Sequence, residues 1–257
     1  MKLLYKYRFG SIELLKVSLE LSVGPSLYRK LETLCDRGYI GKRYESSYKI
    51  RGLPAAYCVL AKGLQELQKL PGYEPIDEKV IKYSYKDKTV SQAFISHNLQ
   101  VYRTAIELQR LYPAIKFFTR RELTGRKHFP KNLPDAFVSL QAENTAKPRR
   151  YFLDLIPDST PRYVIDKRIG DYYEFFETGG WEATKSPLPA MLLLCESGSF
   201  EKRLQQLVSR KRRSLDSDEP EYFTSTLSAL KSVNADSKII WSNVDQPDEP
   251  QALDVLN

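Results

Sequence analysis

Residues 132–181 read NLPDAFVSLQAENTAKPRRYFLDLIPDSTPRYVIDKRIGDYYEFFETGGW. Pro134 and Asp135 lead into a short apolar run, a polar loop follows, and the chain returns as the apolar run 151–156, which carries Asp154. Aromatic and β-branched residues favour a half-buried sheet, so we expect a hairpin with one acid on each arm. A buried carboxylate is costly unless a positive group meets it, and a divalent cation is the obvious candidate.

The chain around this hairpin alternates helical and strand patterns. Residues 162–177 predict a helix with apolar side chains near the 3.6-residue period, and Lys167 and Arg168 lie beside its apolar face. Residues 190–195 form a continuous apolar run, as in strands that are buried on both faces. The remaining expected elements are helices at 91–112, 200–213 and 222–233 and strands at 115–119 and 238–241.

The first seventy residues predict a small helical module. Ser11 suits the N-cap of a helix that begins at Ile12. A second helix spans residues 25–37, because proline is favoured at the first helical position and glycine just past the end. Its inward face is apolar, and its outer face carries hydroxyl and basic side chains at spacings of three and four: Ser26, Arg29, Lys30, Thr33 and Arg37.

The continuation favours a DNA-binding arrangement. Residues 40–50 and 55–60 predict two strands, and a helix starts near Ala61 and covers Leu64, Leu67 and Leu70. Helix, helix, hairpin and helix is the order of a winged helix, in which the second helix enters the major groove. Basic residues of the wing would then contact phosphates: Lys42, Arg43, Lys49 and Arg51. A solvated helix face is the alternative explanation for the outer face of the second helix.

Composition limits the classes of function. The chain has 257 residues, 42% of them hydrophobic, and a net charge of +8. Residues 1–75 carry 13 Lys and Arg against 7 Asp and Glu, so the N-terminal third is the basic part. A basic module makes double-stranded DNA the leading partner, because phosphate neutralisation supplies affinity before any base is read. Three scattered cysteines and no long apolar stretch predict a cytoplasmic protein without a membrane partner.

The sequence predicts four regions. Residues 1–73 are expected to form the winged-helix DNA-binding domain, residues 74–88 a linker, residues 89–242 a second domain, and residues 243–257 an acidic flexible tail. The fold class is therefore α+β or α/β, with a winged helix-turn-helix followed by a mixed sheet flanked by helices.

The second domain resembles the PD-(D/E)xK restriction-endonuclease-like fold. Pro134 and Asp135 match the "PD", and Asp154, 19 positions later, matches the "D/E". The resemblance implies that Asp135 and Asp154 hold Mg²⁺ and that a lysine two positions after the second acid activates water. Ile156 occupies that lysine position and cannot donate a hydrogen bond or transfer a proton.

The chain from about residue 3 to residue 241 also resembles the replication-relaxation family of plasmid and mobile-element proteins. In that family an acid often stands at the place of Ile156 and a basic residue at that of Arg168, so this sequence departs at the first and keeps the second. The resemblance is carried by eight short segments in order: Leu27–Leu31, Gly38–Ile40, Ala56–Leu60 with Gly63 and Leu67, His97–Leu99, Pro134–Ala136, Phe152–Asp154, Arg168–Ile169 with Tyr172, and Gly180–Trp181.

Three functions fit these patterns. The first is a DNA-binding accessory protein for plasmid or mobile-element replication, relaxation or mobilisation, with a relaxase or replication protein as partner and a homodimer suited to a two-fold site. The second is a Mg²⁺-dependent endonuclease in which Lys167, or Arg168, replaces the missing lysine beside Asp135 and Asp154. The third is a winged-helix transcriptional regulator, which no Gly-rich phosphate loop supports.

The two acids also have a structural explanation. Asp135 would start a strand through a turn, and Asp154 would form a salt bridge with Arg149, Arg150 or Lys167. We favour this structural or vestigial role over metal binding, and accordingly we lean against an enzyme.

Overall fold

The computed structural model describes residues 1–22, 25–71, 73, 76–141 and 147–254, and the chain divides into two compact units, residues 1–106 and 107–257. The first unit begins with three helices, α1 (Lys2–Tyr7), α2 (Ile12–Ser18) and α3 (Ser26–Asp36). The Ser11 side chain caps α2 as expected by accepting a hydrogen bond from the Leu14 N–H at 3.3 Å. Helix α1 has no counterpart among the expected elements.

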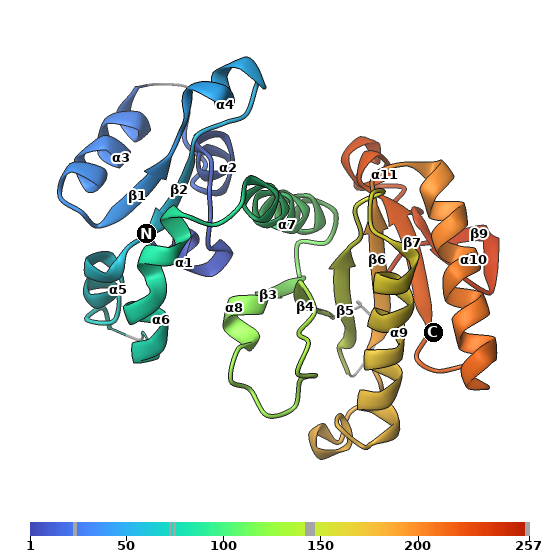
Figure 1. The fold of residues 1–257 in the computed structure, drawn as a ribbon. Helices are drawn as coiled ribbons and strands as arrows, with labels where there is room; N and C mark the ends of the chain where they lie inside the picture. Colours follow the sequence, from blue (N-terminus) through green and yellow to red (C-terminus); the bar gives the residue numbers. More distant parts are fainter. Residues whose placement is uncertain (23–24, 72, 74–75, 142–146, 255–257) are drawn as a thin grey trace. The chain divides into compact units, whose positions relative to one another are not determined.

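A two-stranded antiparallel sheet completes the core of this unit (Figure 1). Strand β1 (Ile40–Arg43) pairs with β2 (Ala56–Val59), and Gly10, just before α2, forms a bridge with Tyr57 of β2. Helix α5 (Ala61–Leu67) follows, and it begins where the sequence predicts. Up to the end of α5 the chain therefore runs helix, bridge, helix, helix, strand, short helix, strand and helix.

The strand expected over residues 40–50 is corrected by the structure. Pairing with β2 ends at Arg43, and residues 46–50 form the short helix α4 (Ser46–Ile50). Tyr48 explains the difference, because its side chain is 3% exposed and the helical turn buries it. Gly52 then turns the chain back with a φ of 62°, which is a left-handed conformation that glycine adopts readily.

Residues 78–88, which the sequence places in a linker, form helix α6 (Glu78–Tyr83) and the 3₁₀ helix η1 (Ser84–Lys88). Asp87 is 2% exposed and forms an ion pair with Arg8 at 2.8 Å. The charges in this segment include a buried, paired carboxylate, so the segment is fastened to the first unit. The expected boundaries at 73 and 88 thus fall within one compact unit, which extends to Ile106.

Helix α7 (Gln92–Leu111) is the long amphipathic helix that the sequence predicts, and it runs from the first unit into the second. The second unit is built on a seven-stranded mixed sheet in the order β3-β4-β5-β6-β7-β8-β9. Its strands are β3 (Lys116–Thr119), β4 (Ala136–Leu140), β5 (Arg149–Leu155), β6 (Ala190–Cys195), β7 (Tyr222–Thr226), β8 (Trp241–Asn243) and β9 (Gln246–Gln251). Strands β5, β6 and β7 are parallel, and the remaining neighbours are antiparallel.

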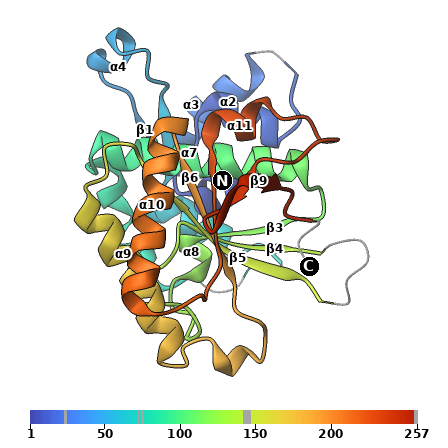
Figure 2. The same ribbon diagram turned by 90° about the vertical axis from the view of Figure 1, so that its right-hand side faces the viewer.

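Two long helices cover one face of this sheet (Figures 1 and 2). Helix α9 (Arg162–Glu177) has the predicted bounds, and α10 (Gly198–Leu215) packs beside it. Shorter helical segments in this unit are α8 (Arg120–Leu123), η2 (Glu182–Thr184) and α11 (Leu227–Ser232). This mixed sheet with flanking helices is compatible with a restriction-endonuclease-like domain.

Two expectations for the C-terminal part are wrong. The helix predicted over residues 222–233 is strand β7 followed by the short helix α11. Every residue of β7 is buried, and its aromatic and hydroxyl β-formers suit a central strand between β6 and β8. The tail expected from residue 243 instead supplies β9, which pairs with β8 at the sheet edge, and residues 255–257 lie outside the described chain.

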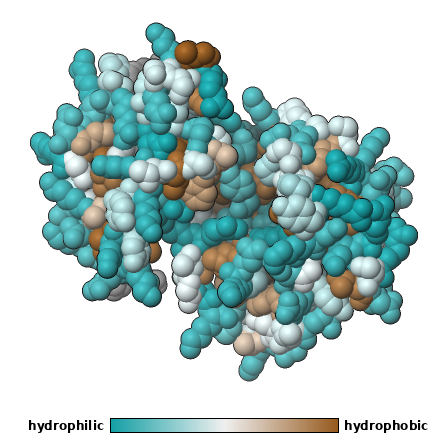
Figure 3. Space-filling model, viewed as in Figure 1, coloured by the Kyte–Doolittle hydropathy of each residue, from teal (hydrophilic) through white to brown (hydrophobic). Residues whose placement is uncertain are grey.

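The face of the molecule drawn in Figure 3 is mostly hydrophilic, and its hydrophobic residues lie in scattered spots. In the described parts of the chain, none of the helices combines the length and the apolar character needed to cross a membrane.

Candidate acid–arginine site

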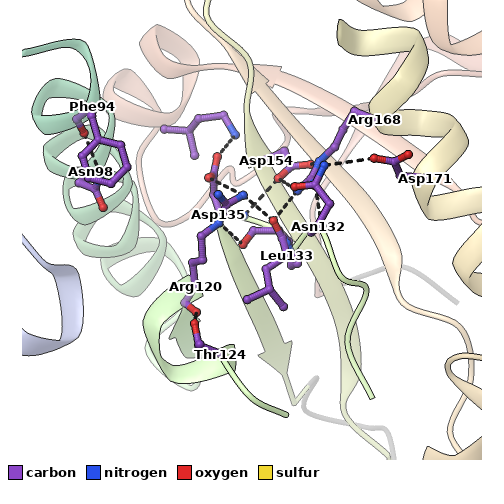
Figure 4. Close-up of polar contacts among 12 residues, drawn as sticks. Phe94, Asn98, Arg120, Thr124, Asn132, Leu133, Asp135, Asp154, Arg168 and Asp171 are labelled. Atoms are coloured by element: carbon purple, nitrogen blue, oxygen red, sulfur yellow. Dashed lines mark hydrogen bonds and ion pairs between the residues drawn. The ribbon is translucent and has the colours of Figure 1, made fainter. Parts of the chain in front are cut away.

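The hairpin of β4 and β5 brings the two acids together, as the sequence predicts. Ala136 pairs with Leu153, so Asp135 at the start of β4 lies beside Asp154 near the end of β5. The Asp135 N–H donates to Asp154 Oδ1 at 3.1 Å, and the Leu155 N–H donates to Asp135 Oδ2 at 3.0 Å. The two residues are 9% and 3% exposed, so each carboxylate is held by the backbone of the other arm (Figure 4).

Arg168 of α9 meets Asp154 with both arms of its guanidinium. Its Nε donates to Asp154 Oδ2 and its Nη2 to Asp154 Oδ1, each at 2.8 Å. The remaining donors reach the loop before β4, where Nη1 bonds to Asn132 O at 2.6 Å and Nη2 to Leu133 O at 2.7 Å. A bidentate arginine–carboxylate pair combines strength with fixed geometry. Arg168 therefore fastens α9 to both arms of the hairpin (Figure 4).

Tyr172 completes the group one helical turn after Arg168. Its hydroxyl donates to Asp154 Oδ2 at 2.8 Å, and the Arg168 guanidinium lies 4.5 Å from the centre of its ring. Residues four apart share a face of a helix, so α9 presents both donors to one carboxylate. The four-residue spacing of Arg168 and Tyr172 is the feature of the sequence from which their shared contact with Asp154 could have been predicted.

The surroundings keep both donors protonated. Burial lowers the pKa of Arg168, but the charge and hydrogen bonds of Asp154 outweigh burial and raise it above the ordinary arginine value. Burial raises the pKa of Tyr172 well above its usual range, and the Asp154 charge raises it further. Arg168 is thus a permanent cation, and Tyr172 is a neutral hydroxyl donor around neutral pH.

Lys167, the expected migrated catalytic lysine, has a different partner. Its side chain is 73% exposed, and its Nζ lies 3.1 Å from Asp171 Oδ1. Asp171 also accepts a hydrogen bond from the Asn132 side-chain amide at 3.2 Å. Partial burial raises the pKa of Asp171, but the bonds from Asn132 and Lys167 outweigh it and lower the pKa. The structure therefore joins Lys167 to Asp171, while Arg168 takes Asp154.

The structural partners expected for Asp154 are corrected in the same way. Arg149 pairs with Glu221 at 2.7 Å, Lys167 pairs with Asp171, and Arg150 forms no ion pair within the described residues. These three residues were expected partners because they are positively charged, and Arg149 and Arg150 are also close to Asp154 in the sequence. The pair with Arg168 depends on where α9 crosses β5, which is a tertiary feature.

Ile156, at the lysine position of the fold, has an apolar role. Its side chain is partly buried against the hydrophobic cluster of the second unit, and its N–H donates to Leu194 O at 2.7 Å. Ile156 therefore supplies no positive group to Asp135 or Asp154.

The residues present do not fit a Mg²⁺ ion. Mg²⁺ needs carboxylate oxygens with free lone pairs in octahedral geometry, whereas Asp154 gives both oxygens to Arg168 and Tyr172. Arg120 adds a second positive group, with its Nη2 at 3.7 Å from Asp135 Oδ1. Across the parts of the chain that the structure describes, no three His, Cys, Asp or Glu side chains cluster as metal ligands.

The predicted DNA-contacting residues divide into two groups. In α3, Leu27 and Leu31 are buried, while the five expected outer-face residues are exposed, the last of them as the C-cap just past the end of the helix: Ser26, Arg29, Lys30, Thr33 and Arg37. Lys49 and Arg51 are also exposed, but they lie in and just after α4, not on a wing strand.

Lys42 and Arg43 of β1 have structural partners. Lys42 Nζ lies 2.9 Å from Glu32 Oε1, and this hydrogen bond raises the pKa of Lys42. Arg43 donates to the backbone oxygens of Lys88 and Val90 at 2.7 and 3.1 Å. These two side chains fasten β1 to α3, to the last residue of η1 and to Val90 just after it.

Comparison with known proteins gives limited matches. No model of a known protein family matches the chain, and no curated protein matches it. Among solved structures, restriction endonuclease FokI is similar, with a TM-score of 0.35 and 13% identity over 86% of this chain. The match spans 40% of the FokI chain. Membership of the replication-relaxation family stays a prediction from the sequence.

Proposed function

We propose that the protein is a DNA-binding accessory protein whose second unit has a nuclease-like sheet but does not cut DNA. The exposed, basic outer face of α3 is the observation that carries DNA binding. Arg29 lies on the side of the helix opposite the buried Leu27 and Leu31, and Lys30 is exposed on the flank of that side. A helix of this kind can approach a groove without disturbing the core of its own unit.

The arrangement around α3 supports a winged-helix reading of this unit. Helices α2 and α3 precede the antiparallel pair β1 and β2, and Gly10 adds a bridge to β2 before α2. The segment between β1 and β2 stands where a wing would be, with Lys49 and Arg51 exposed in it. Positive charge at this position would follow the phosphate backbone.

Replacing Arg29 and Lys30 together with alanine is expected to weaken duplex binding about 10- to 100-fold at low salt and to reduce the slope of log K against log salt by about 2. Two phosphate-neutralising groups are lost, and both side chains are exposed, so the fold should survive. The measurement is a fluorescence-anisotropy titration of labelled duplex DNA at several salt concentrations.

A matched control removes the same charge from another helix of the same unit. Lys79 and Lys82 are exposed residues of α6. Changing both to alanine should alter the affinity far less than the change on α3. An equal loss in the two double variants would mean that binding follows net charge alone, and it would contradict the role of α3.

The hydrogen bonds between Arg168 and Asp154 favour an accessory protein over the endonuclease alternative. An enzyme that uses Asp135 and Asp154 with Lys167 and Mg²⁺ would need the carboxylate oxygens that Arg168 holds. We expect supercoiled plasmid to remain intact after incubation with the protein and Mg²⁺ or Mn²⁺. Cleavage that disappears in both Asp135→Ala and Asp154→Ala would establish the endonuclease and overturn the accessory function.

A role in plasmid or mobile-element replication, relaxation or mobilisation, with a relaxase or replication protein as partner, rests on the sequence resemblance alone. Plasmid transfer and copy number in cells with and without this protein would decide it. A homodimer on a two-fold DNA site belongs to the same proposal, and sedimentation with and without DNA tests it. A transcriptional regulator would leave transfer unchanged and alter transcript levels.

A further inference from the structure

A groove runs along α10 in the second unit, between this helix and the hairpin of β8 and β9. Its volume is about 1290 Å³, which is room for a segment of a polymer, not for a single ion. One wall is the α10 face that carries Lys202, Gln206, Arg210 and Arg213, and the other includes Asp248 of β9.

The α10 wall is a continuous row of hydrogen-bond donors. The four side chains are separated by four, four and three residues, which places them on one face of the helix. At a rise of 1.5 Å per residue the row is about 16 Å long, and along one strand of duplex DNA phosphates follow at about 3.4 Å of axial distance. The row therefore matches several consecutive phosphates of one strand.

These side chains are available to a ligand. Lys202, Gln206 and Arg210 are exposed and form no ion pair or side-chain hydrogen bond within the described chain. Arg213 is exposed and uses its Nε on the Ser209 carbonyl at 3.3 Å, which leaves its terminal nitrogens. The neighbouring Arg212 differs, because it is 6% exposed and forms an ion pair with Asp245.

Charge on α10 favours an anion. The helix contains six basic residues and one acidic residue, Glu201. The Glu201 carboxylate accepts a hydrogen bond from the Thr224 hydroxyl of β7 at 3.0 Å, and burial raises the pKa of Glu201. The negative group that remains exposed in the groove is Asp248 on the opposite wall.

We propose that this groove binds the sugar–phosphate backbone of duplex DNA as a second contact, separate from α3. That the ligand is DNA rests on the proposed function. Arginine and lysine neutralise phosphates, and glutamine amides donate to phosphate oxygens without reading a base. Asp248 opposes the ligand and limits its affinity. The groove lies at β8 and β9, whereas the acid pair lies at β4 and β5, so the two features are separated across the sheet.

The test uses the full chain and a labelled duplex in anisotropy titrations across a range of salt. Arg210→Ala with Arg213→Ala is expected to weaken binding about 10-fold near 50 mM salt and to reduce the salt slope by about 2. Asp248→Asn is expected to tighten binding roughly 3-fold, the effect of one charge at about 6 Å in water. Arg203→Ala removes one exposed arginine of α10 that lies outside the groove; it is a single-charge control and should change the affinity little.

The outcomes separate this inference from the proposed function. If the α3 double variant weakens binding while the groove variant behaves like Arg203→Ala, the groove does not contact DNA and the role of α3 stands. If the groove variant weakens binding and the α3 variant does not, the groove is the contact and the role of α3 is wrong. A wild-type chain that fails to bind duplex DNA overturns both. Opposite shifts in the arginine variant and in Asp248→Asn support the groove.

Discussion

Replacing Arg168 with alanine should lower the free energy of unfolding of the second unit by about 3–5 kcal/mol, because removal of one partner leaves the other charge buried and uncompensated. Asp154 is 3% exposed and would keep only the Tyr172 hydroxyl and the Asp135 N–H as donors. The variant would also free the carbonyl of Asn132, whereas the carbonyl of Leu133 would keep a hydrogen bond from Arg120 Nη2.

Urea unfolding followed by tryptophan fluorescence measures this effect. The chain has two tryptophans, Trp181 and Trp241, and both lie in the second unit and are buried. Their fluorescence therefore reports on the unit that contains the acid pair. If the free energy of unfolding falls with urea at the same slope in the wild type and in Arg168→Ala, the shift in the unfolding midpoint gives the change in stability.

Lys167→Ala is the matched control, since it removes an adjacent cation whose ion pair is exposed. An exposed pair of residues four apart contributes less than about 1 kcal/mol. A loss of similar size in Lys167→Ala and Arg168→Ala would contradict the assignment of Arg168 as the buried partner of Asp154.

Phe152→Ala should also destabilise the second unit by about 3–5 kcal/mol, the range for removing a buried aromatic ring. Phe152 of β5 is fully buried, and five aromatic rings surround it with centroids 5.6–6.0 Å away: Phe129, Phe137, Tyr172, Phe176 and Trp181. The cavity would also loosen Tyr172, whose hydroxyl holds Asp154.

Circular dichroism in urea is the better measurement here, because the change alters the surroundings of Trp181 directly. Tyr163→Ala on α9 is a suitable control, because its side chain is 73% exposed and such surface changes are usually within about 0.5 kcal/mol. A Phe152 variant that unfolds at the wild-type urea concentration would show that the ring cluster does not support the sheet.

Local sequence patterns predicted those helices and strands whose ends are marked by nearby residues such as proline and glycine. Helix α9 follows Pro161 and ends shortly before Gly179, and the predicted bounds match the structure. The hairpin of β4 and β5 was found from two apolar runs, each with one acid. In contrast, β7 is followed directly by the helix α11, and the predicted helix over residues 222–233 extended this helical pattern back over a strand that lies between β6 and β8.

Only the part of the candidate site that lies on the hairpin of β4 and β5, the acid pair, could be predicted from the sequence. The register of β4 and β5 places the two acids side by side, and this follows from local pairing. The identity of their cation depends on how α9 packs over β5, and Arg168 and Lys167 are adjacent in sequence but meet different carboxylates. In the first unit, the buried Tyr48 likewise replaces an expected strand with a helical turn.

The last strand of the sheet carries a barrier to self-assembly. Strand β9 reads QPDEPQ, so Pro247 and Pro250 offer no amide hydrogen to a further strand, and Asp248 and Glu249 repel a copy of themselves. An open margin with unpaired amides would invite fibril growth wherever many copies gather. This margin instead disfavours the addition of a further strand beside β9.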